Sequence, residues 1–428
     1  MDFTQNRRLS QIHEQTLIIG VDVAKHKHVA RAIDDRGRDL TKRLTFSNNL
    51  AGFQALLAWG NELAAQHQRP HIIVGMEPTG HYWLNLAYQL KAAGLFPVVV
   101  NPTKVKRSKE LDDDSPSKND TKDAKVIAQI IRDGRYHEPL LPEGIFAELR
   151  EGMKLHDMIQ EDLSALKARM HNALDRYFPE LLGVYDKWTT QTVLYLLEKS
   201  YLPQDLCQRS EEDLLQELKT HVNKSTSRKK VRDLLQVAAS STGVTVGLSM
   251  ARQEIDYLVH QYRALVSRLE ALEAQLEELV LTVPGADKMI AIHGVGPMTV
   301  VAFFAEVGDP MNYRDPKQII KLAGLNLAKN ESGKFKGQTT ITKRGRRRLR
   351  TILYLVARPL AQHNPAFQKL YAYYRKRTGN QLTGKQAYIA LARKLIRIFF
   401  VIRTRDCSFN EHRMIQDIPH LSGGQKAA

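Results

Sequence analysis

The chain has 428 residues, enough for about three domains. It carries 63 Lys and Arg against 46 Asp and Glu, a net charge of +17, and 43% of its residues are hydrophobic, which excludes a wholly disordered chain. Two cysteines, Cys207 and Cys407, exclude a disulfide scaffold and a four-cysteine zinc site. With no signal-peptide core and no membrane-spanning apolar run, we expect a soluble cytoplasmic protein. Its positive charge favours a nucleic-acid partner.

The first third of the chain has an α/β pattern. Helical spacing predicts helices over 50–65 and 81–93. Apolar runs predict strands at 16–22, 28–34, 41–46, 71–77 and 96–100. Three strands followed by alternating helices and strands indicate an α/β domain, which we place at residues 15–145.

The rest of the chain is predicted to be helical, with a linker and coiled coil over 146–282, a compact basic domain over 283–405 and a frayed tail over 406–428. Apolar residues recur at alternating steps of three and four at Ile255, Leu258, Tyr262, Leu265, Leu269, Leu272, Leu276 and Leu279. This seam predicts a coiled coil or long helical hairpin that assembles a homo-oligomer, a dimer or a tetramer. Val259 and Val266 widen the stripe, which favours the alternative of an intramolecular bundle.

Carboxylates stand at the ends of two predicted strands and at the start of a helix. Asp22 and Glu77 end their strands, and in open α/β sheets such ends line the ligand crevice. Asp120 and Asp123 lie three residues apart before the helical run 124–131, so they can point the same way. Four converging carboxylates need divalent cations, and all-oxygen sites suit Mg²⁺ or Mn²⁺. Two such ions can clamp the attacking and leaving oxygens of a phosphodiester.

A structural alternative is that Asp120 and Asp123 form only a helix cap, and the neighbouring acidic run 112–114 could rival them. The order of the acids favours the catalytic interpretation. A strand acid, a second strand acid and then helix acids, around a three-stranded meander, match the ribonuclease H-like nucleotidyl-transferase fold.

The basic C-terminal region contains three candidate nucleic-acid elements. Gly294 and Gly296 lie in a turn that resembles a helix-hairpin-helix hairpin, although a plain interhelical turn is the alternative. A dense cationic run predicts phosphate contacts, with a solvated surface as the alternative; its members are Lys343, Arg344, Arg346, Arg347, Arg348 and Arg350. Ser332, with Lys334 close by, is a candidate nucleophile or an ordinary loop serine.

These motifs together resemble one family. The segments GVDVAK (20–25), EPTG (77–80) and NDTKDA (119–124) are similar to the N-terminal domain of the DEDD insertion-sequence transposases of the one-ten and eleven-eleven type, which are bridge-RNA-guided recombinases. The segments GVGP (294–297), AGL (323–325), ESG (331–333) and KRG (343–345) are similar to their C-terminal transposase domain. Thr342 stands where the family usually has serine, and Arg346 where it usually has a smaller polar residue.

The resemblance implies a RuvC-like domain with a metal-binding tetrad of Asp22, Glu77, Asp120 and Asp123, a catalytic Ser332, donor and target DNA, and a guide RNA. We therefore expect an α/β RuvC-like domain, a helical middle and an all-α transposase domain. The expected function is transposition through a phosphoserine bond to DNA. A RuvC-like nuclease that uses water, or a non-catalytic nucleic-acid-binding assembly protein, are the alternatives.

Overall fold

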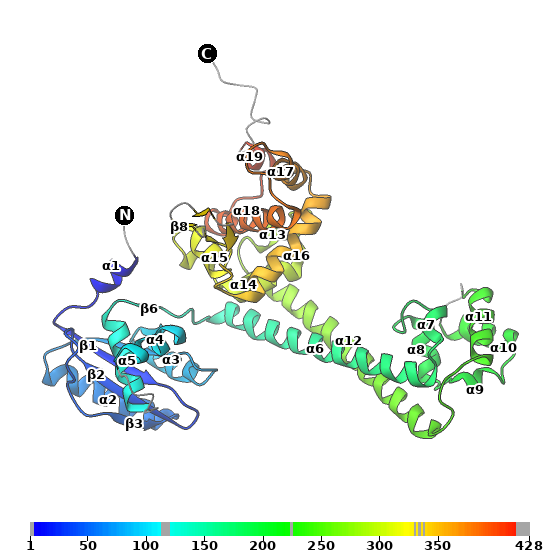
Figure 1. Cartoon of the computed structure of the whole chain (residues 1–428), viewed down its shortest axis with the longest axis horizontal. Coiled ribbons are helices and arrows are strands. Elements are labelled where there is room, and N and C mark those ends of the chain that lie inside the picture. The colour runs from blue at the N-terminus through cyan, green and yellow to red at the C-terminus, as the bar shows by residue number, and fades with distance from the viewer. Residues whose placement is uncertain are drawn as a thin grey trace, which may run out of the picture. The chain divides into compact units, whose positions relative to one another are not determined.

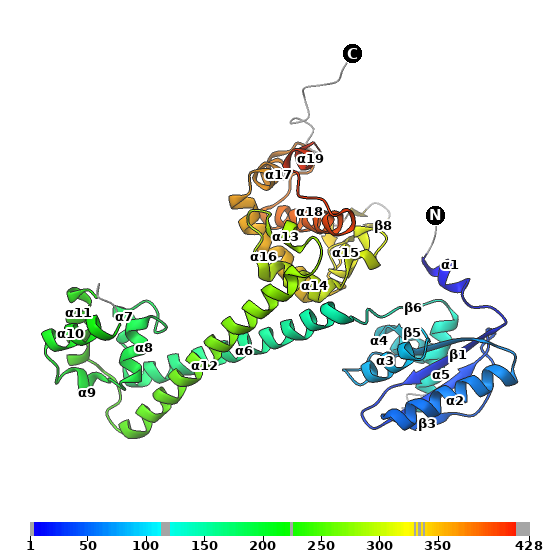
Figure 2. The ribbon, with the colours of Figure 1, turned by 180° about the vertical axis from the view of Figure 1, so that it is seen from behind.

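The structure is a computed structural model, and it describes residues 4–112, 120–222, 226–328, 331–332, 335–336 and 339–416. The chain divides into two compact units, an N-terminal unit (Met1–Leu141) and a C-terminal unit (Pro142–Ala428). Figures 1 and 2 show the ribbon from opposite sides. Within the described ranges, no helix combines the length and the apolar character that crossing a membrane requires.

The N-terminal unit is built on a six-stranded sheet with the strand order β3-β2-β1-β4-β5-β6. Strands β1, β2 and β3 pair antiparallel, β1 pairs parallel with β4 and β4 with β5, and β6 is antiparallel to β5. Its elements are α1 (Thr4–Leu9), β1 (Thr16–Asp22), β2 (Lys27–Ile33), β3 (Leu44–Ser47), α2 (Leu50–Gln66), β4 (His71–Met76), α3 (Trp83–Ala92), β5 (Pro97–Val100), α4 (Pro102–Asp112), α5 (Asp120–Arg132) and β6 (Tyr136–His137).

The predicted mixed α/β domain is confirmed, with differences in detail. The predicted strand at 41–46 is confined to Leu44–Ser47, and the sequence pattern did not indicate α1, α4 or β6. Strand β6 has two residues, and its pairing with Val99 and Val100 of β5 defines it rather than any local apolar pattern.

Helices cover both faces of this sheet, and the alternation of side chains along β1 shows how. Leu17, Ile19 and Val21 join the core beneath α2 and α3. Ile18 joins a second core with residues of α4 and α5. Because successive strand residues point to opposite faces, the even-numbered positions of β1 face α5.

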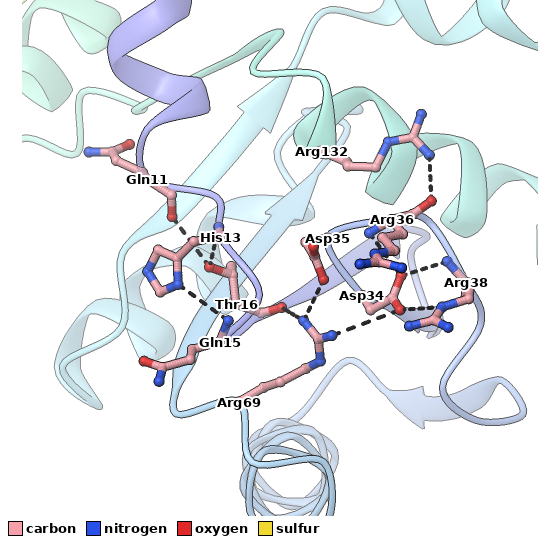
Figure 3. Close-up of polar contacts among 10 residues, drawn as sticks. All are labelled: Gln11, His13, Gln15, Thr16, Asp34, Asp35, Arg36, Arg38, Arg69 and Arg132. Carbon is pink, nitrogen blue, oxygen red and sulfur yellow. Dashed lines mark hydrogen bonds and ion pairs between the residues drawn. The ribbon is translucent and has the colours of Figure 1, made fainter.

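A buried carboxylate holds together the edge of the sheet where β1 begins (Figure 3). Asp34, 1% exposed, follows β2 and accepts hydrogen bonds from the backbone N–H groups of Arg36 and Arg38, and from Arg38 Nε at 2.7 Å. Arg69 lies 3.8 Å from the same carboxylate and donates to the Thr16 carbonyl at 3.1 Å. Burial alone would raise the pKa of Asp34, but the hydrogen bonds from Arg38 and Arg36 outweigh it and hold the pKa below its ordinary value.

We expect Asp34→Asn to destabilise the N-terminal unit by about 1–3 kcal/mol at neutral pH, because the donors around this buried side chain lose a charged acceptor. Since the folded pKa is depressed, the contribution is fully present above the carboxyl's unfolded pKa of about 3.9 and is lost as the pH falls below it. Hydrogen exchange of the β1 and β2 amides measures this. The exposed Glu62→Gln should show no change, and an Asp34→Asn penalty that persists undiminished at pH 2 would contradict the assignment.

The part of the C-terminal unit that the structure describes is helical apart from four two-residue strands. Its elements up to the second long helix are α6 (Gly144–Tyr177), α7 (Leu181–Val184), α8 (Gln191–Glu198), α9 (Pro203–Leu206), α10 (Glu211–His221), α11 (Arg228–Ala239) and α12 (Leu248–Leu281). They are followed by α13 (Ala286–Ile290), α14 (Pro297–Val307), the 3₁₀ helix η1 (Pro310–Asn312), α15 (Pro316–Leu322), β7 (Leu327–Ala328), β8 (Glu331–Ser332), β9 (Phe335–Lys336), β10 (Thr340–Ile341), α16 (Arg347–His363), α17 (Pro365–Lys376), α18 (Gly384–Arg405) and α19 (Glu411–Ile415).

The predicted heptad seam packs within the chain. Helices α6 and α12 lie side by side in both views and run antiparallel, with Leu276 against Gly152 near one end and Ile255 in one core with Met170 near the other. An intrachain helical hairpin therefore accounts for the pattern that suggested a subunit interface.

Separate cores lie at the two ends of this hairpin. Helices α7–α11 surround one core, at the end where α6 finishes and α12 begins, which we call the far core. Helices α13–α19 surround the other, at the end where α6 begins and α12 finishes, which we call the near core. Met414 of α19 belongs to the near core, so residues 406–416 are folded and the prediction of a frayed tail from 406 was wrong for them. Residues 417–428 lie outside the described part of the chain.

Candidate active site and nucleic-acid interface

Two of the predicted acidic residues lie at the ends of adjacent parallel strands. Val21 pairs with Met76 in the register of β1 and β4, so Asp22 and Glu77, each one residue further on, follow neighbouring positions at the same edge of the sheet. Both side chains are half-buried. The carboxyl ends of parallel strands are where open α/β sheets bind ligands.

Helix α5 brings the third acid to this edge. A Cβ atom on Gly20 would lie 2.2 Å from the Ala124 carbonyl oxygen, so the backbone of α5 rests directly on β1 at a position where only glycine fits. Asp123 precedes Ala124, and Asp22 lies on the same face of β1 as Gly20. The fold therefore brings Asp22, Glu77 and Asp123 to one edge of the sheet, on its α5 face.

Asp120 is the first residue of α5, one turn before Asp123, and its side chain lies outside the described part of the structure. Among the side chains that the structure describes, no three His, Cys, Asp or Glu lie close enough together to hold a metal ion. The three described acids thus share an edge and a face of the sheet without forming a closed ligand set of their own.

A buried histidine that sequence reasoning missed fixes the turn after Asp22. His28 on β2 is fully buried, and its Nδ1 accepts a hydrogen bond from the Ala24 N–H at 3.2 Å. Burial lowers the pKa of His28, although a hydrogen bond with Asn48 opposes the shift. A neutral imidazole is needed to accept this bond, so His28 acts as a positioning residue for the turn. The sequence could have indicated this role, because His28 occupies an inward-facing position of a strand in which buried and more exposed residues alternate.

Ser332 lies on a short strand pair in the C-terminal unit. Strand β8 pairs antiparallel with β9, with Ser332 opposite Phe335, and β7 pairs antiparallel with β10. The two pairs lie in sequence between α15 and α16, with β8 and β9 inside β7 and β10. Lys334 lies outside the described residues, as does the side chain of Ser332.

Two glycines join the loops on either side of these strands. Gly324 has a φ of +66°, and a Cβ atom on Gly345 would lie 2.6 Å from the Gly324 nitrogen. The Lys343 N–H donates to the Gly324 carbonyl at 3.0 Å, and the Thr342 hydroxyl donates to the same oxygen at 3.3 Å. A serine at position 342 has the same hydroxyl, so this departure from the family pattern keeps the bond.

The six cations of the basic run fall into two classes. Three are half-buried and hold the protein together: Arg346 donates to the Glu306 carbonyl, Arg348 pairs with Asp157 at 2.6 Å, and Arg350 donates to the Ala323 carbonyl at 2.9 Å. Burial and the neighbouring Arg150 lower the pKa of Arg346, despite the nearby Glu306 carboxylate. The other three, Lys343, Arg344 and Arg347, are exposed.

The predicted glycine turn lies beside one of these exposed cations. Gly294, with a φ of +96°, packs against the Leu360 backbone of α16, and Gly296 caps the start of α14. A cavity of about 890 Å³ is lined by Gly294, Gly296 and Arg347 together with residues of α6, α14 and α16. The structure thus brings the turn and part of the basic run to a single hollow.

Comparisons with known proteins agree with these motifs. Residues 19–179 match the model for DEDD transposases of IS110 type, and residues 286–372 match the model for transposases of the IS116/IS110/IS902 family. The chain belongs to the IS110 family of insertion-sequence transposases.

Some relatives match this IS110-family chain along most of its length, and others match about a third of it. The uncharacterized 44.8 kDa protein of insertion element IS116 from Streptomyces clavuligerus is 27% identical over 395 residues, 90% of this chain and 94% of that protein. The uncharacterized 43.6 kDa protein of IS110 from Streptomyces coelicolor is 25% identical over 301 residues, 70% of this chain and 73% of that protein. The transposase for IS1111A from Coxiella burnetii is 29% identical over 147 residues, 34% of this chain and 40% of that protein.

The two family matches of the IS110-family transposase cover different parts of the candidate site. The first includes all four acids, and the second includes the glycine turn, Ser332 and the basic run. The acids lie in the N-terminal unit and Ser332 in the C-terminal unit. Asp22, Glu77, Asp120 and Asp123 offer only carboxylate oxygens, the donors that Mg²⁺ and Mn²⁺ prefer, so their chemistry fits a hard divalent cation.

Proposed function

We propose that this transposase cuts and rejoins DNA through Ser332, assisted by Mg²⁺ or Mn²⁺ held by Asp22, Glu77, Asp120 and Asp123. The observation that carries the proposal is the placement of three of these acids at one edge and on one face of the sheet, where α5 rests on Gly20. The sheet order, with an antiparallel β1–β2–β3 meander beside parallel β4 and β5, supports a ribonuclease H-like fold for the N-terminal unit.

In the proposed reaction, the Ser332 oxygen attacks the phosphorus of a DNA phosphodiester. The new serine–phosphorus bond replaces the bond to the adjoining nucleotide, whose oxygen leaves with the proton that the serine gives up. A hydroxyl of another DNA strand then attacks the phosphoserine and restores the free serine. Because the bond energy is conserved, rejoining needs no nucleotide cofactor. The bound metal ions supply positive charge where negative charge develops on the phosphate.

We further propose that a guide RNA selects the DNA, as the resemblance of the sequence motifs implies, and that the acids and Ser332 of one active site come from different subunits of a homo-oligomer. Their location in separate compact units of the chain supports the second proposal.

The direct test is to stop the reaction with denaturant and look for DNA covalently attached to the full-length protein. We expect an adduct on the peptide that contains Ser332 when a divalent cation is present. Cleaved DNA without any adduct would instead favour the nuclease that uses water.

We expect the exposed cations to contact phosphates. Replacing Lys343, Arg344 and Arg347 together by Gln should weaken DNA binding regardless of sequence, because each contact to a phosphate releases counterions. The slope of log binding constant against log salt should become less steep by up to ~0.9 per lost contact. Fluorescence anisotropy across a salt series measures this.

The matched control is Arg348→Gln, which removes one charge from the same run. Its partner Asp157 and the Met153 carbonyl lie on α6, so this variant should lower the melting temperature and leave the salt slope nearly unchanged. If the triple variant keeps the parental slope of log binding constant against log salt, the three exposed cations face solvent and do not contact DNA phosphates.

A further inference from the structure

Another pocket, which shares no lining residue with the hollow beside the basic run, lies where the end of α18 meets α19. It has a volume of about 440 Å³, within the range of small-ligand sites. Of the described residues that line it, four are basic and none is acidic. The basic residues are Lys394, Arg397, Arg405 and Arg413.

The charge of this pocket follows from the sequence of α18. The helix has six basic residues and no Asp or Glu over its 22 positions. Arg397 and Arg405 reach the pocket with Ile398 and Val401, the spacing of one helical face. Arg413 comes from α19, so two elements separated by the turn at 406–410 contribute cations to the same space.

Arg403 of α18 has a structural role, whereas the arginines that line the pocket have no such ion pair with any residue that the structure describes. Arg403 pairs with Asp309 at 2.8 Å. Asp406 follows Arg405 directly in the sequence, but its carboxylate accepts a hydrogen bond from Lys288 Nζ at 2.7 Å. Arg405 lies in the last helical turn, where a cation also favours the helix dipole, but Arg397 does not. In the described part of the chain, no acidic side chain pairs with Arg397, Arg405 or Arg413.

The clustered guanidinium groups leave a positive field in this region. Burial and the charge of Arg397 lower the pKa of Arg393, so the two cations repel one another. Such a cluster is stabilised by an anion, and the planar guanidinium group matches phosphate oxygens in pairs of hydrogen bonds. Ser408 adds an exposed hydroxyl, which can donate to a phosphate.

We propose that Arg397, Arg405 and Arg413 bind a phosphodiester group of nucleic acid in this pocket, in addition to the contacts made by the basic run. The inference rests on the proposed function, since it adds a second backbone contact to a DNA-transposing enzyme. The phosphodiester can belong to DNA or to RNA, and the experiment separates the two.

Cys407 lines the pocket and provides an internal probe, because the other cysteine, Cys207, belongs to the α7–α11 subdomain. Both thiols of the full-length protein are modified with a thiol reagent, with and without duplex DNA or an RNA hairpin. With nucleic acid at about ten times its Kd, the fraction of protein molecules whose pocket is unoccupied falls to about a tenth. Modification of Cys407 should therefore slow about tenfold. Cys207 should react at an unchanged rate.

Two triple variants complete the test. Arg397→Gln/Arg405→Gln/Arg413→Gln should lose the protection of Cys407, whereas Lys343→Gln/Arg344→Gln/Arg347→Gln should keep it at a nucleic-acid concentration that restores binding. Anisotropy on the same samples verifies binding, and melting temperatures verify folding. Protection by DNA, by RNA or by both supports the proposal and identifies the source of the phosphodiester.

Three results would overturn it. Bound nucleic acid that leaves Cys407 fully reactive would overturn this inference alone. Protection by polyglutamate but by neither nucleic acid would assign the pocket to an acidic protein partner. A chain that binds neither DNA nor RNA would overturn the proposed function as well.

Discussion

Ser332→Ala is expected to abolish both the covalent DNA adduct and strand transfer, while DNA binding and folding remain unchanged. The loss should be on the order of 10⁴-fold or more, the scale seen when a covalent nucleophile is removed. A serine hydroxyl is a weak nucleophile at neutral pH, but the methyl group of alanine has no lone pair and cannot attack phosphorus at all. Gel separation of denatured reaction products measures adduct and joined strands together.

Two comparisons make this result specific. Ser332→Cys should retain at most a trace of activity, because the sulfur is nucleophilic but lies further from the backbone than the oxygen. Ser267→Ala is the matched control at an exposed serine of the same unit, and it should form the adduct at the parental rate. If Ser332→Ala still cleaves DNA in Mg²⁺ at nearly the parental rate, water is the nucleophile and the enzyme is a nuclease.

The second large effect concerns the acids. Asp22→Asn, Glu77→Gln, Asp120→Asn and Asp123→Asn should each reduce recombination by more than about a hundredfold, since even outer-shell partners of metal ligands are worth about 10- to 100-fold. Folding should survive, because removing one of several neighbouring negative charges relieves repulsion. Recombination assays in Mg²⁺ and in Mn²⁺ measure the loss, and thermal unfolding verifies the fold.

The exposed Glu14→Gln serves as the control in the same unit and should recombine normally. Asp123 is the decisive position, because its alternative role is to cap α5. Full activity in Asp123→Asn, with a lowered melting temperature, would make it a helix cap and remove it from the proposed metal site.

Local pattern predicted the framework of the N-terminal unit well. The strands that end at Asp22 and just before Glu77 could be predicted because continuous apolar runs are buried on both faces of a sheet, and the acids interrupt them. Two-residue β6 could not, because it exists through its partner β5. Nothing near Gly20 in the sequence indicates that α5, a hundred residues later, rests on it.

The C-terminal unit shows a different limit. The seam on α12 was visible, but its period is the same whether the partner helix belongs to the same chain or to another, so the choice of α6 was not predictable. The basic run was also visible as charge. Which cations pair with Asp157 or with backbone carbonyls depends on α6, α14 and α15, and no local pattern separates Arg348 from Arg347.

The contact between Gly20 and α5 has a consequence for inherited variation in this enzyme. A single methyl group at position 20 would meet the Ala124 carbonyl oxygen at 2.2 Å, and the helix that carries Asp120 and Asp123 would have to move. A loss-of-function allele can therefore arise at a residue that has no side chain and takes part in no chemistry. In a mobile element that decays by random mutation, an intact set of carboxylates would then be an insufficient sign that the copy is active.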